Sequence, residues 1–278
     1  MTKPIEQKHV PVALEYAIEM LGPALVGSNP VLVDGTLGLG GHTEAFLERF
    51  EALTVIGIDR DESALSQAKQ RLARFKNRVI FINGLYSEID LKVQSEGFDS
   101  VDAILLDLGV SSMQLDESER GFAYSYAADL DMRMNQSDRL TAKTVVNEYS
   151  ELELVRIFRE YGEERFAKQI AKEIVKTRQV KPFELTSELA ELISKIVPFI
   201  PGKSTGHPAK RVFQAIRIEV NGELEILEET IPAAVDALRV GGRILVMSYH
   251  SLEDQIVKKS LTSLATSSAP LDMPIELP

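Results

Sequence analysis

The first part of the chain, up to about residue 110, alternates short apolar runs with amphipathic stretches. Continuous apolarity within a run is expected of strands in a parallel sheet that helices cover on both faces. Between the second and third runs, residues 62–75 place Leu65, Ala68 and Leu72 on one side of a predicted helix. The alternation predicts a doubly wound α/β sheet. Its first four strands are residues 31–34, 54–59, 79–83 and 101–107.

Helical spacing dominates the long stretch after the fourth apolar run. It predicts one helix over residues 152–178 and another over residues 187–197. The second of these has Thr186 as a plausible N-cap and Pro198 as its stop. Two further helices are predicted near residues 207–221 and 223–239.

A fifth strand is predicted at residues 243–248, after a turn at Gly241 and Gly242. The gap before it is too long for one crossover, so we predict a sheet domain that a helical insertion interrupts after the fourth strand. After a further helix that ends near Lys259, the chain shows little periodicity and is expected to be mobile. The predicted boundaries are residues 1–112 and 206–278 for the sheet domain and 113–205 for the insertion.

Composition narrows the chemistry that is open to this chain. Its 278 residues include no Cys, which removes disulfides, Cys-ligated zinc or iron–sulfur centres, and a Cys nucleophile. No metal site is expected. The net charge of −11 argues mildly against general binding to nucleic acid or membrane surfaces. Residues 1–6 lack the features of a signal peptide and no apolar run could span a bilayer, so we expect a soluble, cytoplasmic protein with no membrane partner.

A glycine-rich loop, DGTLGLGGH, follows the first predicted strand at residues 34–42. The dinucleotide-binding fingerprint needs a third Gly where Thr43 stands. S-adenosylmethionine (AdoMet) carries a sulfonium cation, which suits a loop that begins with an acid, Asp34. Asp59, 25 residues later, fits an acid that binds ribose hydroxyls in either cofactor class. The loop favours AdoMet and leaves a nicotinamide dehydrogenase as the weaker alternative.

Three of the four predicted strands end at an acid: Asp34, Asp59 and Asp107. The carboxyl ends of parallel strands share one edge, where open α/β sheets bind their ligands. This arrangement favours a ligand site over the alternative that the glycines form only a tight turn. From the loop itself we take Asp34 and Gly38 as candidate cofactor contacts.

Longer strings of residues resemble one family specifically. Together they resemble the ribosomal RNA small subunit methyltransferase H family, bacterial enzymes that use AdoMet to methylate N4 of a decoding-region cytidine in 16S rRNA. The resemblance covers about residues 6–258. The strings are DGTLGLGGH (34–42), GIDRD (57–61), LLDLGVSSMQLD (105–116), ERGF (119–122), LDMRM (130–134), HPAKRVFQAIRI (207–218), VNGEL (220–224) and SYHSLED (248–254).

The resemblance implies a class I AdoMet-dependent methyltransferase with a Rossmann-like sheet, S-adenosylhomocysteine as product, and an insertion that helps to bind RNA. The implied partner is 16S rRNA, as part of the small ribosomal subunit, and a homodimer is left open. Members usually continue past the position of Pro278 with strands that return to the sheet edge. The cofactor contacts that the resemblance implies are Gly40, Gly41, His42, Asp59, Tyr86, Asp107 and Gln114.

The lack of Cys also bears on how a cytosine could be methylated. Carbon-5 methylation uses a covalent nucleophile, and radical AdoMet chemistry needs thiolate ligands, so direct displacement by a nitrogen or oxygen acceptor remains. We expect Asp107, or carbonyls of residues 107–112, to accept a hydrogen bond from N4. Tyr249 is a candidate to stack on a flipped base and His250 to accept the released proton. In the alternative, the pair only begins a helix, with Ser251 and Glu253 as caps.

Positive charge gathers in one part of this acidic chain. Residues 161–217 hold 11 Lys and Arg against 6 Glu and no Asp. A basic helix face suits contacts with RNA phosphates, although such a face is usually only solvated and Lys210 and Arg211 could pair with carboxylates. An enzyme for another base or a small molecule, and an inactive assembly factor, remain as alternatives. The candidate RNA-binding residues are Lys168, Lys172, Lys176, Lys203, Lys210, Arg211 and Arg217.

Overall fold

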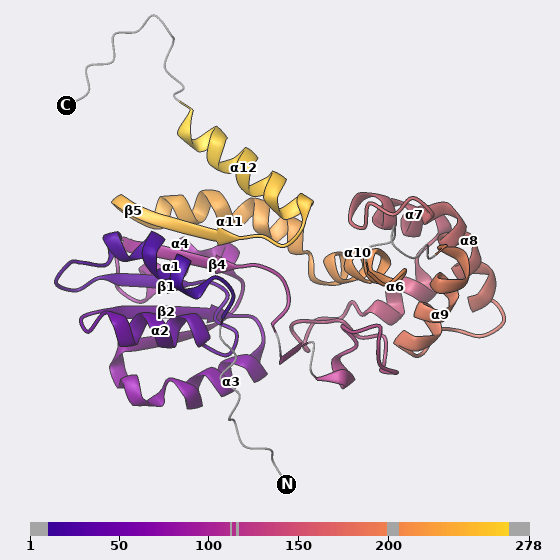
Figure 1. The fold of residues 1–278 in the computed structure, drawn as a ribbon, viewed down its shortest axis with the longest axis horizontal. Helices are drawn as coiled ribbons and strands as arrows, with labels where there is room; N and C mark the ends of the chain where they lie inside the picture. Colours follow the sequence, from indigo (N-terminus) through magenta and orange to yellow (C-terminus); the bar gives the residue numbers. More distant parts are fainter. Residues whose placement is uncertain (1–10, 112, 115–116, 199–205, 267–278) are drawn as a thin grey trace, which may run out of the picture.

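A parallel five-stranded sheet forms one end of the molecule and a group of helices forms the other (Figure 1). The computed structural model describes residues 11–111, 113–114, 117–198 and 206–266. All strand pairs are parallel, and the strand order is β3-β2-β1-β4-β5. The doubly wound α/β fold is thereby confirmed. The strands are β1 (Val31–Asp34), β2 (Thr54–Asp59), β3 (Val79–Asn83), β4 (Val101–Asp107) and β5 (Leu238–Met247).

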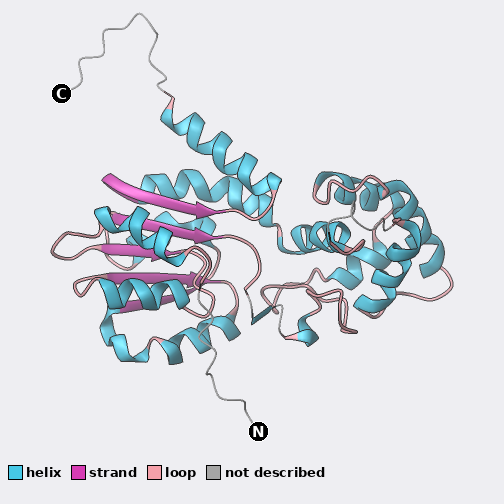
Figure 2. Cartoon of the chain, in the orientation of Figure 1, coloured by secondary structure: helices cyan, strands magenta, loops and turns pink. Residues whose placement is uncertain are grey.

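Helices cover both faces of the sheet, which explains why the strands are apolar on both sides (Figure 2). Alternate residues of a strand serve opposite faces: Leu32 packs with the first group of helices and Val33 with the second. The first group is α1 (Leu14–Leu21), α2 (Gly41–Arg49) and α3 (Glu62–Arg71). The second group is α4 (Ile89–Ser95), α11 (Glu223–Ala237) and α12 (Ser251–Ala265). Short 3-10 turns, η1 (Gly22–Ala24), η2 (Ala73–Arg78) and η3 (Tyr86–Glu88), connect these elements.

The remaining helices pack around a hydrophobic core of their own and are called here the helical unit. Its elements are η4 (Ser118–Arg120), α6 (Ala142–Glu148), α7 (Glu151–Glu160), α8 (Ala167–Arg178), α9 (Thr186–Ile196) and α10 (Lys210–Asn221). Val212, Phe213 and Ile216 of α10 belong to this core because they face the helical unit rather than the sheet. The core of the unit therefore extends beyond residue 205, where the sequence pattern placed its end.

Two predicted helices are shorter or divided in the structure. The one expected over residues 62–75 stops at Arg71, and the chain continues as the 3-10 turn η2, within which Lys76 has a positive φ of 51°. The one expected over residues 152–178 is split into α7 and α8. At the break Gly162 lies so close to the backbone of α10 that a Cβ would meet the Arg211 carbonyl oxygen at 2.7 Å. Such a contact depends on tertiary packing, which helical periodicity does not report.

The predicted N-cap of α9 is also wrong. Thr186 is the first residue of the helix, and its hydroxyl donates to the Tyr126 carbonyl and accepts from the Ala128 amide. The capping role belongs to the Glu188 carboxylate, which accepts from the backbone amides of Glu184 and Leu185.

At the other end of the chain, β5 and α12 are both longer than the sequence pattern predicted. β5 begins at Leu238 rather than at residue 243, and Gly241 (φ 82°) lies inside it at a bulge opposite Val101–Ala103, not in a preceding turn. α12 continues past Lys259 to Ala265, and its Leu261 packs against the hydrophobic cluster that includes residues of α11. Residues 267–278, which were expected to be mobile, lie outside the described residues.

A buried network fastens the helical unit to the carboxyl edge of the sheet. Asp61 caps α3 by accepting from the amides of Ser63 and Ala64. Its Oδ2 also accepts from Arg120 Nη2 of the helical unit at 3.0 Å, and the two side chains are only 3% and 10% exposed. Arg120 donates further to the carbonyls of Arg133 and Met134. Through these bonds the helical unit is held beside the ends of the strands.

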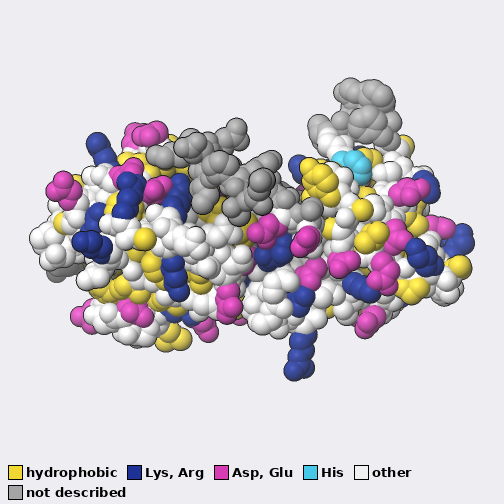
Figure 3. Space-filling model, turned by 90° about the horizontal axis from the view of Figure 1, so that it is seen from below, with side chains coloured by type: hydrophobic (Ala, Val, Ile, Leu, Met, Phe, Trp, Pro, Cys, Tyr) yellow, Lys and Arg dark blue, Asp and Glu magenta, His cyan; other side chains and the backbone are white. Residues whose placement is uncertain are grey.

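Charges on the surface are mixed in sign. On the face drawn in Figure 3, Lys and Arg side chains are interspersed with Asp and Glu over both ends of the molecule. In the helical unit, Lys176, Lys181 and Lys195 each pair with a nearby glutamate. The local excess of positive charge is therefore partly neutralised within the fold. In the ranges that the structure describes, no helix has both the length and the apolarity required to cross a bilayer.

We predict that Arg120→Met lowers the free energy of unfolding by about 3–5 kcal/mol, because it leaves Asp61 buried without its cation. The matched control is Arg74→Met, which removes an arginine whose side chain is 54% exposed and pairs with Glu44 and Glu48. An exposed pair of that kind contributes about 1 kcal/mol or less. Urea unfolding followed by circular dichroism measures both variants. Equal losses in the two would contradict the role given to Arg120.

Candidate active site

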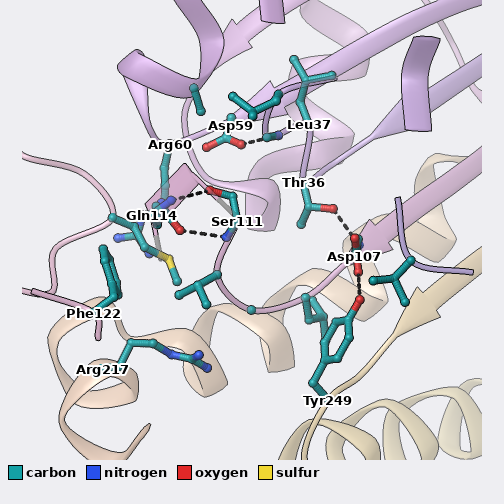
Figure 4. A pocket seen from close by; sticks show the side chains of 18 of the residues that line it. Thr36, Leu37, Asp59, Arg60, Asp107, Ser111, Gln114, Phe122, Arg217 and Tyr249 are labelled. Atoms are coloured by element: carbon teal, nitrogen blue, oxygen red, sulfur yellow. Dashed lines mark hydrogen bonds between the residues drawn. The ribbon is translucent and has the colours of Figure 1, made fainter. Parts of the chain in front are cut away.

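A cavity of about 660 Å³ opens at the carboxyl ends of β1, β2 and β4. One wall is the glycine loop after β1, with Thr36, Leu37 and Gly38. The opposite wall is the helical unit, which contributes Phe122, Tyr124, Met134, Phe213, Gln214 and Arg217. Figure 4 shows Asp59 and Leu37 at one side of this cavity and Arg217 and Tyr249 at the other. The site thus lies where the predicted strand ends meet the helical unit.

The glycine loop closes tightly over the end of β2. Gly38 (φ 53°) and Gly40 (φ 75°) both take left-handed conformations, which only glycine adopts without strain. The Gly38 amide donates to Asp59 Oδ2 at 2.7 Å. Gly38, Gly41 and His42 line the cavity, whereas Gly40 does not. A Cβ at Gly40 would lie 2.8 Å from Leu72, so this glycine allows the loop to pack on α3.

Asp34 lies behind the loop and not on the cavity wall. Its Oδ2 accepts from the Thr43 hydroxyl at 2.7 Å, and its Oδ1 accepts from the Thr36 amide. Burial raises the pKa of this carboxyl, although His42 nearby lowers it in part. The interpretation of Asp34 as a direct contact for a cation is therefore not what the geometry shows. Asp34 ties the loop to α2, and Thr43 is its partner in that role.

Asp59 stands at the end of β2 and faces the cavity. Each of its oxygens accepts one backbone amide, from Gly38 at 2.7 Å and from Asp61 at 2.8 Å, and each keeps a second lone pair. Burial raises the pKa of Asp59 from 3.8 to about 6, against the opposing effect of the two amides. The carboxylate is thus a preorganised acceptor that loses its charge in mildly acidic solution.

Asp107 and Tyr249 both line the cavity and are hydrogen-bonded to each other. Tyr249, just after β5, donates its hydroxyl to Asp107 Oδ1 at 2.5 Å, and Asp107 Oδ2 lies 3.8 Å from His42 Nδ1. The Asp107 amide donates to the Thr36 hydroxyl, which fixes the end of β4 against the loop (Figure 4). Burial raises the pKa of Asp107, and the Tyr249 hydrogen bond offsets part of that rise. Burial and Asp107 also raise the pKa of Tyr249, so its hydroxyl stays a donor.

His250 also lines the cavity, but its ring nitrogens contact its own helix. It is the N-cap of α12, its Nδ1 accepts from the Glu253 amide, and its Nε2 lies 3.1 Å from Glu253 Oε1. Glu253 in turn accepts from the amides of Tyr249 and His250. Burial acts to raise the pKa of Glu253, but these hydrogen bonds and His250 together lower it. The helix-start alternative therefore describes His250, with Glu253 as the reciprocal cap.

The other cofactor candidates also reach the cavity. Gln114 lines it while its side chain accepts from the Ser111 amide and donates to Asp61. Tyr86, on η3, lines it as a half-buried residue, and desolvation raises the pKa of its phenol. Arg60, Phe122 and Phe213 also line the cavity and were missed as site residues, although each falls within a string that signalled the family.

The candidate RNA-binding residues divide into separate groups. Lys210 and Arg217 line the cavity, whereas Arg211 donates to the Glu163 carbonyl at 2.8 Å. The α8 lysines lie on the part of the helical unit that is farther from the sheet than α10 (Figure 1). Lys203 lies outside the described residues. The three α8 lysines, all exposed, are Lys168, Lys172 and Lys176.

Comparison with known proteins gives a consistent result. A family model described as the MraW methylase family matches residues 6–278. A Ribosomal RNA small subunit methyltransferase H from Pseudarthrobacter chlorophenolicus is 55% identical, covering 99% of this chain and 85% of that protein. Proteins of the same name from Nocardia farcinica and Thermobifida fusca are 54% and 53% identical, covering 98% and 97% of this chain and 85% and 82% of theirs.

Among solved structures, the likeness is local. An rRNA methylase from Streptococcus thermophilus is 21% identical and overlaps 41% of this chain and 57% of that one, with a TM-score of 0.26. The match of the family model and of the relatives, in contrast, spans nearly the whole sequence. The chain therefore belongs to the MraW methylase family, and it is an AdoMet-dependent methyltransferase built on a class I, Rossmann-like sheet.

Proposed function

We propose that this chain methylates the exocyclic N4 of a decoding-region cytidine in 16S rRNA, within the small ribosomal subunit, and releases S-adenosylhomocysteine. The observation that carries the proposal is the Asp107–Tyr249 pair, which places a hydrogen-bond acceptor beside an aromatic ring inside the cavity. The names of the relatives, which specify ribosomal RNA of the small subunit, point to the same class of substrate.

The cavity suits AdoMet at its sheet side. Its volume exceeds that of a nucleoside with an amino-acid tail, which leaves room for a second ligand. We assign the binding of the ribose hydroxyls to Asp59, whose oxygens keep free lone pairs. The backbone of Gly38 and Gly41 lines the same side of the cavity. His42, Tyr86 and Gln114 complete the wall around the bound cofactor. AdoMet supplies an electrophilic methyl group on its sulfonium.

Asp107 is placed to activate the acceptor nitrogen. Cytosine N4 is a weak nucleophile because its lone pair is delocalised into the ring, and a carboxylate that accepts from the amino group favours a pyramidal nitrogen. The new N–C bond forms as the C–S bond breaks, and N4 then loses one proton. Because burial raises the pKa of Asp107, this carboxylate is a better proton acceptor than an exposed aspartate. We assign proton acceptance to Asp107 rather than to His250, whose ring faces Glu253.

Tyr249 holds both Asp107 and the base. Its hydroxyl fixes one oxygen of Asp107, and the residue lines the cavity with 54% of its surface exposed. A ring in that position can stack on a base that has left its own stack. His250 and Glu253 act through Tyr249, because they cap α12 and hold the backbone from which the ring projects.

Phosphate contacts would come from two separate places. Lys210 is exposed at the cavity, where it can hold the backbone next to the target nucleotide. Lys168, Lys172 and Lys176 on α8 are farther away, so they would contact a remote part of the rRNA, with Lys176 also held by Glu173. Arg211 contributes less, since its guanidinium already donates to the Glu163 carbonyl.

Mass mapping of rRNA nucleosides from cells with and without the gene tests the proposal. We expect N4-methylcytidine at the decoding region to be lost with the gene and restored by the wild-type chain. An unchanged level of that nucleoside would refute the function. Restoration by a variant that cannot bind AdoMet would instead favour an assembly factor.

For the target side, we predict that Tyr249→Ala lowers kcat for methylation about 100-fold while the dissociation constant for AdoMet changes less than about threefold. Tyr249→Phe keeps the ring and loses only the hydrogen bond to Asp107, so it should retain more activity. Single-turnover kinetics and calorimetric titration measure the two quantities. Loss of AdoMet binding in Tyr249→Ala would count against a role at the target base.

For the cofactor side, we predict that AdoMet binding weakens as the pH falls through about 6, because only the ionised Asp59 accepts from both ribose hydroxyls. The dissociation constant should rise about tenfold between pH 7.5 and pH 5. Asp59→Asn should bind weakly at every pH, without this step. If Asp59→Asn kept the pH dependence of the wild-type chain, the group that titrates would be a residue other than Asp59.

A further inference from the structure

We propose that Arg217 recognises the target base itself, by donating to N3 and O2 of the cytosine, and does not serve as a phosphate contact. This inference rests on the function proposed above. It names the side chain that distinguishes cytosine from uracil once a base is in the cavity. Cytosine presents an acceptor at N3, whereas uracil presents an N–H there, which an arginine cannot accept.

Arg217 lies deep in the cavity on a face of α10 that lines it continuously. Lys210, Phe213, Gln214 and Arg217 follow one another at helical spacing, and all four line the cavity. Lys210 is exposed, whereas the Arg217 side chain is only 17% exposed. Seven residues of helix separate the two by about 10 Å. The face therefore runs from an exposed cation at Lys210 to a largely buried guanidinium at Arg217.

Glu223 fixes the orientation of that guanidinium. Its two oxygens accept from Arg217 Nε at 2.8 Å and Nη2 at 2.9 Å, and its side chain is only 9% exposed. In the described part of the chain no hydrogen bond from Nη1 accompanies these two. A bidentate pair of this kind uses one side of the planar fork and leaves the other side to a ligand.

The same pair makes Arg217 a poor phosphate contact. Its charge is balanced at close range by Glu223, so it adds little to the attraction of a polyanion. The backbone at this position is also fixed, because Asn221 Nδ2 donates to the Arg217 carbonyl and to the Met132 carbonyl. A neutralised and rigid donor suits the reading of a base edge, while a flexible lysine such as Lys210 suits a phosphate.

Arg217 and Asp107 together match the hydrogen-bond pattern of cytosine. In Figure 4, Arg217 extends from α10 on the same side of the cavity as Tyr249, which reaches up to Asp107. Cytosine offers a donor at N4 and acceptors at N3 and O2. An acceptor at Asp107 and a donor at Arg217 Nη1 fit that order, with the ring of Tyr249 against the base. Uracil would place its O4 against the Asp107 carboxylate and its N3–H against Arg217.

The test compares cytidine with 3-deazacytidine at the target position of 16S rRNA in reconstituted small subunits. The analogue keeps the N4 amino group but replaces N3 with a C–H group. Replacing cytidine by the analogue should lower kcat/KM of the wild-type chain about 10- to 100-fold more than it lowers kcat/KM of Arg217→Met. The wild-type chain loses a hydrogen bond from Arg217 to N3, whereas the variant has no such bond to lose. An equal effect of the analogue on both chains would overturn the inference.

Two further variants keep the result interpretable. Arg217→Lys retains a cation beside Glu223 but lacks the free Nη1 of the guanidinium, so replacing N3 by C–H should no longer lower its kcat/KM. This variant gives the answer if Arg217→Met folds poorly. Lys210→Met, on the same helix face, should raise KM for the subunit in a salt-dependent way and keep the full N3 effect. If the wild-type chain fails to methylate cytidine at all, the proposed function fails; if it methylates cytidine and Arg217→Lys keeps the N3 effect, only the inference about Arg217 fails.

Discussion

The active site depends on the buried bond between Asp61 and Arg120. Asp61 caps α3 at the carboxyl edge of the sheet, and Arg120 belongs to the helical unit, so this bond sets the distance between the two walls of the cavity. Gln114 binds the same carboxylate, which extends the network along the cavity wall. Because both charges are enclosed, the attachment is rigid and costly to break. The sheet edge and the helical unit thereby form the two walls of one cavity.

The cavity has two chemically different sides. The sheet side offers a carboxylate and backbone groups that glycines bring close, which suits the sugar and the polar tail of AdoMet. The other side offers an aromatic ring, an acceptor and a fixed cation, which suits a base. Asp107 lies between them, and its raised pKa follows from its burial there. The positive charge of the helical unit, in contrast, is partly balanced by local ion pairs of Lys176, Lys181 and Lys195.

Much of the fold could be predicted from the sequence, because apolar strands and amphipathic helix faces leave a regular pattern of hydrophobic residues. Asp59, Asp107 and Tyr249 could be chosen because they follow strands at the ligand-binding edge. Two features could not be predicted: the break at Gly162 and the packing of α10 in the core of the helical unit. Both arise from contacts between segments that are distant in the sequence. The same limit applies to Asp34, whose type and position suggested a ligand contact, while its partner Thr43 holds it behind the loop.

The central claim is that the base enters between Asp107, Tyr249 and the helical unit and accepts the methyl group at N4. Incubating the purified chain with small ribosomal subunits and AdoMet that carries a deuterated methyl group tests this directly, with mass spectrometry of the digested 16S rRNA. The account predicts that the label appears on N4 of one decoding-region cytidine. Label on carbon 5, on a ribose oxygen or on another base would contradict it.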